Sequence, residues 1–136
     1  MLRTMAYGRY EQFVILVHGR APPADEEWQM YLRDLAHWLP ELSGQLIHTT
    51  GGGPTSSQRR ALRDQWPRTG PIDCRTAVVS SELLVRGIVN AINLFTPTIR
   101  SFRPEALDAA LTYIRGALYH DLLRAGLAEQ RSRLHD

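Results

Sequence analysis

Short apolar runs alternate with longer amphipathic stretches, and this alternation limits the fold more than any other feature of the chain. The run Phe13-Val14-Ile15-Leu16-Val17 is β-branched and aromatic, which is typical of a central strand covered on both faces. Further strands are expected at 45–49, 76–79 and 98–102, and segment 2–10 is expected to form an edge strand hairpinned onto the first. This order predicts an α/β fold with a four- or five-stranded mixed sheet, helices packed against it, and right-handed crossovers.

The first two helices have recognisable starting signals. One is expected to begin at Asp25, where acidic residues favour a helix N-terminus, and its apolar stripe continues through Leu39 to Leu42. The other is expected to begin at Thr55 and Gln58, which have the spacing of a capping box, and to continue to residue 67.

Two further helices are expected from their apolar spacing. The third starts with Ser80-Ser81-Glu82 and stops at Thr96-Pro97. The fourth is a single long helix from residue 104. The apolar stripe of the third helix is expected to consist of Leu84, Val85, Ile88, Val89, Ile92 and Phe95, and the core face of the fourth is expected to consist of Leu107, Ala110, Leu111, Ile114, Leu118 and Leu122.

The length of 136 residues, with 43% hydrophobic content, fits one domain with its own core. We expect the core at about residues 13–115 and a C-terminal helical extension at 116–136. This extension is expected to reach a partner, which could be a second copy of the chain. Cys74 is the only cysteine, and neither a signal peptide nor a membrane span is indicated, so a cytoplasmic location is expected.

Composition excludes several functions. All sixteen basic residues are Arg, which rules out a Walker phosphate loop, a kinase strand lysine and a pyridoxal Schiff base. The net charge of +2 does not indicate nucleic-acid binding. The five histidines lack metal-binding spacings, and no catalytic motif is present, so no metal, cofactor or catalytic residue is expected. An enzyme built on Cys74 and a histidine such as His48 remains an alternative.

A Gly-rich segment, residues 49–57, joins a strand to a helix N-terminus, where backbone N–H groups and hydroxyls favour an anion. The same residue types are also explained by a turn followed by a capped helix. The helix after it is rich in Arg and suits an acidic protein surface or a phosphate, although a solvated helix face is the ordinary reading. The candidate partner-binding residues are Gly51, Gly52, Gly53, Ser56, Arg59, Arg60 and Arg63.

The order of elements, the Thr76-Ala77-Val78-Val79-Ser80 strand, the helix through Arg86-Gly87 and the Phe102-Arg103-Pro104-Glu105-Ala106 turn together resemble the STAS or SpoIIAA-like family over about residues 13–115. The resemblance implies a small non-enzymatic regulator, similar to anti-sigma factor antagonists, that binds a regulatory or kinase-like protein.

In the family, an Asp-Ser-Ser-Gly or Asp-Ser-Thr-Gly loop at a helix N-terminus is phosphorylated. The matching segment here is His48-Thr49-Thr50-Gly51, in which His48 stands in place of the Asp. The resemblance therefore implies Thr49 or Thr50 as the phosphoacceptor.

A second branch of similar proteins, STAS/SEC14-like, implies a carrier of a lipid or other small hydrophobic ligand. An apolar groove under the last helices would then be lined or gated by Leu118, Tyr119, Leu122 and Leu123. Helix packing or dimerisation is the alternative explanation of these residues.

Overall fold

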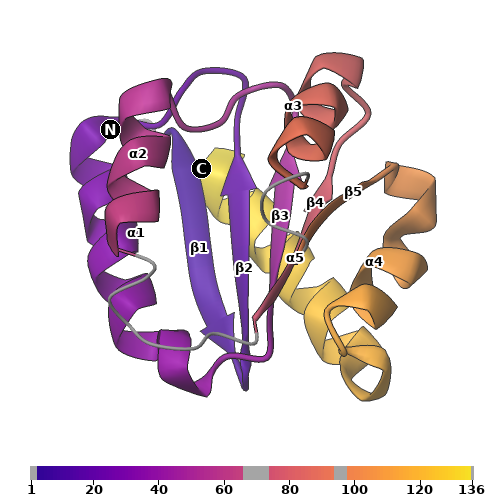
Figure 1. Ribbon diagram of the computed structural model, residues 1–136. Coiled ribbons are helices and arrows are strands. Elements are labelled where there is room, and N and C mark those ends of the chain that lie inside the picture. The colour runs from indigo at the N-terminus through magenta and orange to yellow at the C-terminus, as the bar shows by residue number, and fades with distance from the viewer. Residues whose placement is uncertain (1–2, 66–73, 94–97, 136) are drawn as a thin grey trace.

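A five-stranded sheet lies between two layers of helices in the computed structural model, which describes residues 3–65, 74–93 and 98–135, apart from the side chains of 92, 93 and 135 (Figure 1). The strands are β1 (Met5–Tyr10), β2 (Phe13–His18), β3 (Gly44–Thr49), β4 (Arg75–Val79) and β5 (Ile99–Phe102). They lie in the order β1-β2-β3-β4-β5, with β1 antiparallel to β2 and the others parallel. The predicted α/β class, the mixed sheet and the N-terminal hairpin are confirmed.

The α-helices are α1 (Asp25–Trp38), α2 (Ser56–Gln65), α3 (Leu83–Asn93), α4 (Leu107–Tyr113) and α5 (His120–His135). Short 3-10 turns, η1 (Leu39–Glu41), η3 (Pro104–Ala106) and η4 (Ala117–Tyr119), adjoin α1, α4 and α5. The expected helix end at residue 67, the stripe residue Phe95 and the stop at 96–97 lie outside the described residues, as does the side chain of Ile92.

The two faces of the sheet bury separate hydrophobic cores. Phe13, Ile15 and Val17 of β2 pack toward α4 and α5, whereas Val14 and Leu16 pack toward α1. All six residues of β2 are buried, as expected for a central strand covered on both faces. The alternation of side chains along each strand therefore builds both cores from the same short segments.

The first helix ends earlier than its apolar stripe predicts. Leu39 lies in the 3-10 turn η1, and Leu42 follows it in an extended conformation. Pro40 has no N–H to continue the α-helical hydrogen bonds, and Leu42 N instead donates to Leu39 O at 3.2 Å. Both leucines are nevertheless buried in the α1 core.

The third helix presents a different face to the protein from the one expected. Leu84 and Ile88 are exposed (76% and 41%), and Val89 is the buried position. α3 packs mainly against the edge strand β5, where Ser101 Oγ donates to Asn90 Oδ1 at 3.3 Å. This contact at the edge of the sheet orients the helix, so the prediction that Leu84 and Ile88 face the core was wrong.

The last helix is two helices rather than one. Arg115 adopts a left-handed conformation (φ 69°), and Gly116 N donates to Leu111 O at 2.7 Å, which ends α4 and turns the chain. Helix α5 then runs back across the sheet and packs on β1 and β2 (Figure 1).

This reversal changes which apolar residues of the last segment are buried. Leu123 and Leu127 lie in the core, whereas Leu118 is 94% exposed and Leu122 is 38% exposed. The expectation that Leu118 and Leu122 continue the core face was therefore wrong. Residues 120–135, expected to extend from the core, form much of the layer over β1 and β2.

Candidate functional site

The Gly-rich loop lies at the carboxyl edge of the parallel strands, between β3 and α2, beside the loop that follows β2 (Figure 1). Thr49 is buried, and its Oγ1 accepts from Gly51 N (3.2 Å) and donates to Gly52 O. Gly52 N in turn donates to Gly19 O at 2.9 Å. The loop is therefore held in one shape by its own strand and by the neighbouring loop.

Two of the three glycines are required by this shape. Gly51 has a φ of +128°, which side-chain-bearing residues rarely adopt. A Cβ at Gly52 would overlap the carbonyl oxygens of Gly19 and Ala21. At Gly53, by contrast, none of the described residues lies within 4 Å of a Cβ position.

The capping box expected at Thr55 and Gln58 is confirmed in both directions. Gln58 N donates to Thr55 Oγ1 (3.2 Å), and Thr55 N donates to Gln58 Oε1 (2.8 Å). Gln58 is buried, and its Nε2 also donates to Pro23 O (2.9 Å) and Asp25 Oδ1 (2.8 Å). One side chain thus starts α2 and ties it to the start of α1.

Helix α2 presents basic side chains to solvent. Arg59, Arg60 and Arg63 are exposed, and Asp64 is the one acidic residue of the helix. Arg59 Nη1 donates to Pro54 O (2.8 Å) and its Nη2 to Ser56 Oγ (3.1 Å), so this guanidinium lies against the Gly-rich loop. Within the described part of the chain, Arg60 and Arg63 have no ion pair.

Of the two threonines implied as phosphoacceptors, only one is exposed. Thr49 is 4% exposed and its hydroxyl is engaged on both sides, whereas the adjacent Thr50 lies at the surface. A kinase requires a reachable hydroxyl, so Thr50 is the accessible one of the pair.

The start of α3 adjoins the Gly-rich loop, which sequence reasoning did not anticipate. Glu82 Cγ lies 3.8 Å from a Cβ position built at Gly51. Ser80 is buried and its Oγ accepts from Glu82 N at 3.1 Å, which fixes this turn. Leu83 and Leu84, each 76% exposed, follow directly. The sequence signal that could have placed this turn beside the loop was the order of the parallel strands, because adjacent parallel strands bring the carboxyl ends of β3 and β4 together.

The structure separates the residues of the alternative enzyme. His48 pairs in register with Val79 at the carboxyl end of β4, whereas Cys74 immediately precedes Arg75 at the opposite end. The five-residue separation between positions 74 and 79 along the strand corresponds to about 16 Å. His48 also lies on the α5 face of the sheet, where burial and the Arg131 charge lower its pKa, whereas Cys74 belongs to the α1 core.

The four residues implied as a lipid groove do not share one surface. Leu123 is fully buried against the sheet, and the Tyr119 ring packs on Phe13 with 5.4 Å between ring centroids. Leu118, by contrast, is 94% exposed. Leu123 and Tyr119 therefore pack in or against the core, whereas Leu118 lies on open surface.

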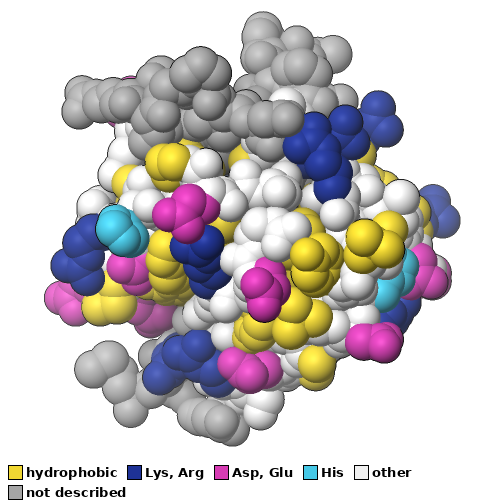
Figure 2. Space-filling view, turned by 90° about the horizontal axis from the view of Figure 1, so that it is seen from below, with side chains coloured by type: hydrophobic (Ala, Val, Ile, Leu, Met, Phe, Trp, Pro, Cys, Tyr) yellow, Lys and Arg dark blue, Asp and Glu magenta, His cyan; other side chains and the backbone are white. Residues whose placement is uncertain are grey.

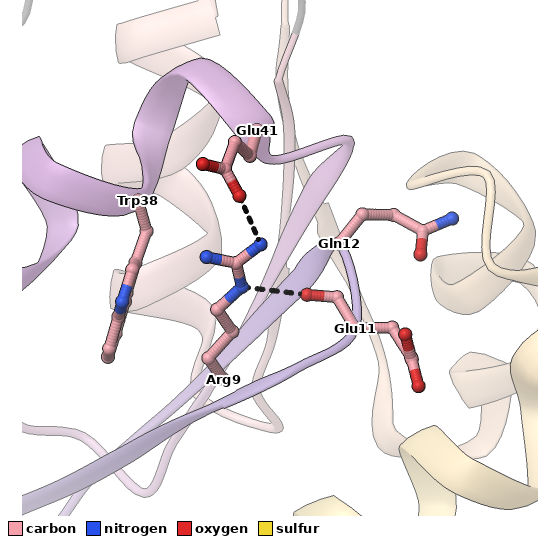
Figure 3. A pocket seen from close by; sticks show the side chains of 5 residues that line it. All are labelled: Arg9, Glu11, Gln12, Trp38 and Glu41. Carbon is pink, nitrogen blue, oxygen red and sulfur yellow. Dashed lines mark hydrogen bonds and ion pairs between the residues drawn. The ribbon is translucent and has the colours of Figure 1, made fainter.

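An open hollow of about 620 Å³ lies at the opposite end of the molecule, beside the β1–β2 turn. Arg9 donates there to Glu41 Oε2 (2.9 Å) and to the Glu11 carbonyl (2.8 Å), while the Glu11 and Gln12 side chains point away from Arg9 and Trp38 (Figure 3). Acidic and basic side chains are interspersed over this end (Figure 2). The lining side chains do not converge on a ligand position.

Among the described residues, no group of three or more His, Cys, Asp or Glu side chains is placed to hold a metal ion. In the same residues, no helix has both the length and the apolar character needed to cross a membrane. The fold and the loop define an α/β protein with a hydrogen-bonded, partly basic rim at the carboxyl edge of its sheet. Comparison of the chain with protein-family models, curated proteins and solved structures found no match.

Proposed function

We propose that this chain is a non-enzymatic regulatory module of STAS type that binds an acidic surface of a protein partner through its Gly-rich loop and α2. The observation that carries the proposal is a fixed loop leading into a helix with three exposed arginines. Both ends of the loop are tied by hydrogen bonds, at Thr49 and at Thr55. A surface that is already ordered loses little conformational entropy on binding.

The chemistry of the rim favours a carboxylate-rich partner. Guanidinium groups form paired hydrogen bonds with carboxylates, and charged groups at the rim of an interface steer association. Arg60 and Arg63 are exposed, so their guanidinium groups are within reach of a partner. The exposed Leu83 beside the loop supplies apolar area to the same contact.

Phosphorylation of Thr50 would regulate this contact. A kinase would transfer the γ-phosphoryl group of ATP to Thr50 Oγ1, releasing ADP and the hydroxyl proton. The product carries close to two negative charges at pH 7, on the exposed part of a loop whose far end bonds the Arg59 guanidinium. Added negative charge at this rim would repel an acidic partner and weaken binding.

The proposal is tested by capture of partners from the native host on the tagged full-length chain, followed by affinity measurement with the purified partner. Reversing two charges with Arg60→Glu and Arg63→Glu is expected to weaken binding by about tenfold to a hundredfold. Arg9→Glu is the matched control and is expected to leave the affinity unchanged, because Arg9 is exposed beside the β1–β2 turn, at the opposite end of the molecule from the Gly-rich loop.

A second pair of variants tests whether the shape of the loop matters. Gly52→Ala is expected to weaken binding because its Cβ overlaps two carbonyl oxygens, whereas Gly53→Ala adds a Cβ in open space and should bind normally. Unchanged affinity in both the double Arg variant and Gly52→Ala would overturn the proposal.

A further inference from the structure

Helix α3 turns its apolar stripe away from the protein. Leu84, Gly87, Ile88 and Ala91 recur at three- and four-residue steps along one side, and all four are exposed. Arg86 lies on another side of the helix, and its Nε is buried with no hydrogen-bond partner among the described residues. Figure 1 shows α3 at the rim beside β4 and β5, apart from α1 and α2. An amphipathic helix normally buries its apolar stripe, so this orientation indicates a surface that another molecule covers.

Gly87, in the middle of the stripe, is not packed against any other described part of the chain. None of the described residues lies within 4 Å of a Cβ built at Gly87, although glycine destabilises a helix interior relative to alanine. A glycine on an open helix face permits close approach of a second backbone. The position therefore fits the crossing point of two helices.

The stripe is sterically complementary to a second copy of itself that runs in the opposite direction. It reads large, small, large, small at Leu84, Gly87, Ile88 and Ala91. In an antiparallel pair with the twofold axis between 87 and 88, Leu84 faces Ala91 of the other copy and Ile88 faces Gly87. Each large side chain then meets a small one at every level, which is the packing that adjacent helices require.

We infer that α3 is a self-association surface, at which a second copy of this chain docks antiparallel through the stripe formed by Leu84, Gly87, Ile88 and Ala91. The stripe carries no charge, so it lacks the basic groups that suit an acidic partner and that α2 presents. Antiparallel pairing also sets the two helix dipoles in opposition, which is favourable.

The size of the helix indicates how strong the association is. Eleven residues of α-helix span only about 16 Å, so the pair buries much less than the roughly 1,600 Å² of a standard stable interface. The dimer is therefore weak and concentration-dependent, with a dissociation constant on the order of 100 μM. This inference does not depend on the proposed function, which uses α2 and the Gly-rich loop.

Sedimentation velocity over about 10 μM to 1 mM tests the inference on the full chain. Leu84→Glu is expected to weaken dimerisation at least about tenfold by burying an unpaired charge. Gly87→Leu is expected to do the same by separating the helices, even though it makes the surface more apolar. Leu118→Glu is the matched control, because Leu118 is 94% exposed elsewhere, and it should dimerise like the unmodified chain.

The Gly87→Leu result separates specific pairing from non-specific hydrophobic association, in which an added leucine would strengthen the dimer. Its side chain enters open space in the monomer, so thermal unfolding is expected to show an intact fold. Thermal unfolding of Leu84→Glu likewise checks that any loss of the dimer is not caused by loss of the folded state.

Cysteine cross-linking tests the register. The double variant Leu84→Cys with Ala91→Cys is expected to form intermolecular disulfides on mild oxidation, whereas either single variant should not. Within one helix the two positions are about 10 Å apart, too far for an intramolecular bridge. A chain that stays monomeric to about 1 mM would overturn the inference, and so would a dimer strengthened by Gly87→Leu or cross-linked by the single variants.

Discussion

His18 is a titratable side chain enclosed where β2 ends. It is 2% exposed, its ring lies beside Trp28 (6.3 Å between centroids), and its Nδ1 has no hydrogen-bond partner among the described residues. Burial disfavours the charged imidazolium and lowers the pKa of His18 from 6.5 to about 4. The folded state therefore holds His18 neutral at pH values where the unfolded chain would protonate it.

This difference predicts loss of stability in acid. Between pH 6.5 and about 4 the unfolded chain binds the extra proton, so the free energy of unfolding falls as the pH falls. The contribution of His18 is fully present above pH 6.5, and about 3 kcal/mol of it is lost by pH 4. Urea unfolding across this pH range measures the effect.

The His18→Phe variant provides the comparison, since it keeps a ring beside Trp28 and removes the titration. Its free energy of unfolding should fall less steeply between pH 6.5 and 4 than that of the unmodified chain. Some slope should remain, because the pKa of His48 is also lowered by burial and by the Arg131 charge. Equal slopes in the two proteins would contradict the account of His18.

Helix α2 depends on few contacts, because Gln58 is its one buried residue. Gln58→Ala removes hydrogen bonds to Thr55 N, Pro23 O and Asp25 Oδ1 and leaves buried polar groups unpaired. We expect it to lower the free energy of unfolding by about 2 to 3 kcal/mol. Thr55→Ala removes only the cap and should cost about 1 kcal/mol. Denaturant unfolding measures both.

Ser57, an exposed neighbour of Gln58, supplies the control for Gln58→Ala and Thr55→Ala. Ser57→Ala should change the free energy of unfolding by no more than about 0.5 kcal/mol. A smaller cost for Gln58→Ala than for Thr55→Ala would show that the contacts with the start of α1 contribute little. The sequence predicted the cap, because a capping box is local. It did not predict the bonds to Pro23 and Asp25, which form only when α1 and α2 pack together.

The same distinction, between local sequence signals and contacts that form only when elements pack, applies to the rest of the fold. The run 13–17 and the break after Thr49 predicted strands and the Gly-rich loop, because β-branched runs and glycines act over a few residues. The face that α3 buries was not predictable, since contact with the edge strand outweighs the apolar stripe of Leu84 and Ile88. In the candidate site, the Arg residues were found by composition, but the neighbouring turn at Glu82 required the strand order.

The molecule needs α5 as a structural layer. α4 and α5 cover one face of the sheet, and α5 lies over β1 and β2, whose inward side chains Phe13 and Ile15 are completely buried. Without α5, that face of the central strand would be exposed to water. The C-terminal segment therefore belongs to the core of the chain, and its contribution to stability should be as large as that of α1.

Adjacent leucines in α5 test this conclusion. Leu123 is fully buried in the core, so Leu123→Ala should leave a cavity and lower the free energy of unfolding by about 3 kcal/mol. Leu122 is 38% exposed, and Leu122→Ala should cost less than about 1 kcal/mol, because its side chain faces partly into solvent. Urea unfolding of both variants measures the difference. Equal small costs would mean that α5 is only loosely attached to the sheet, since the same chemical change at neighbouring positions differs here only in burial.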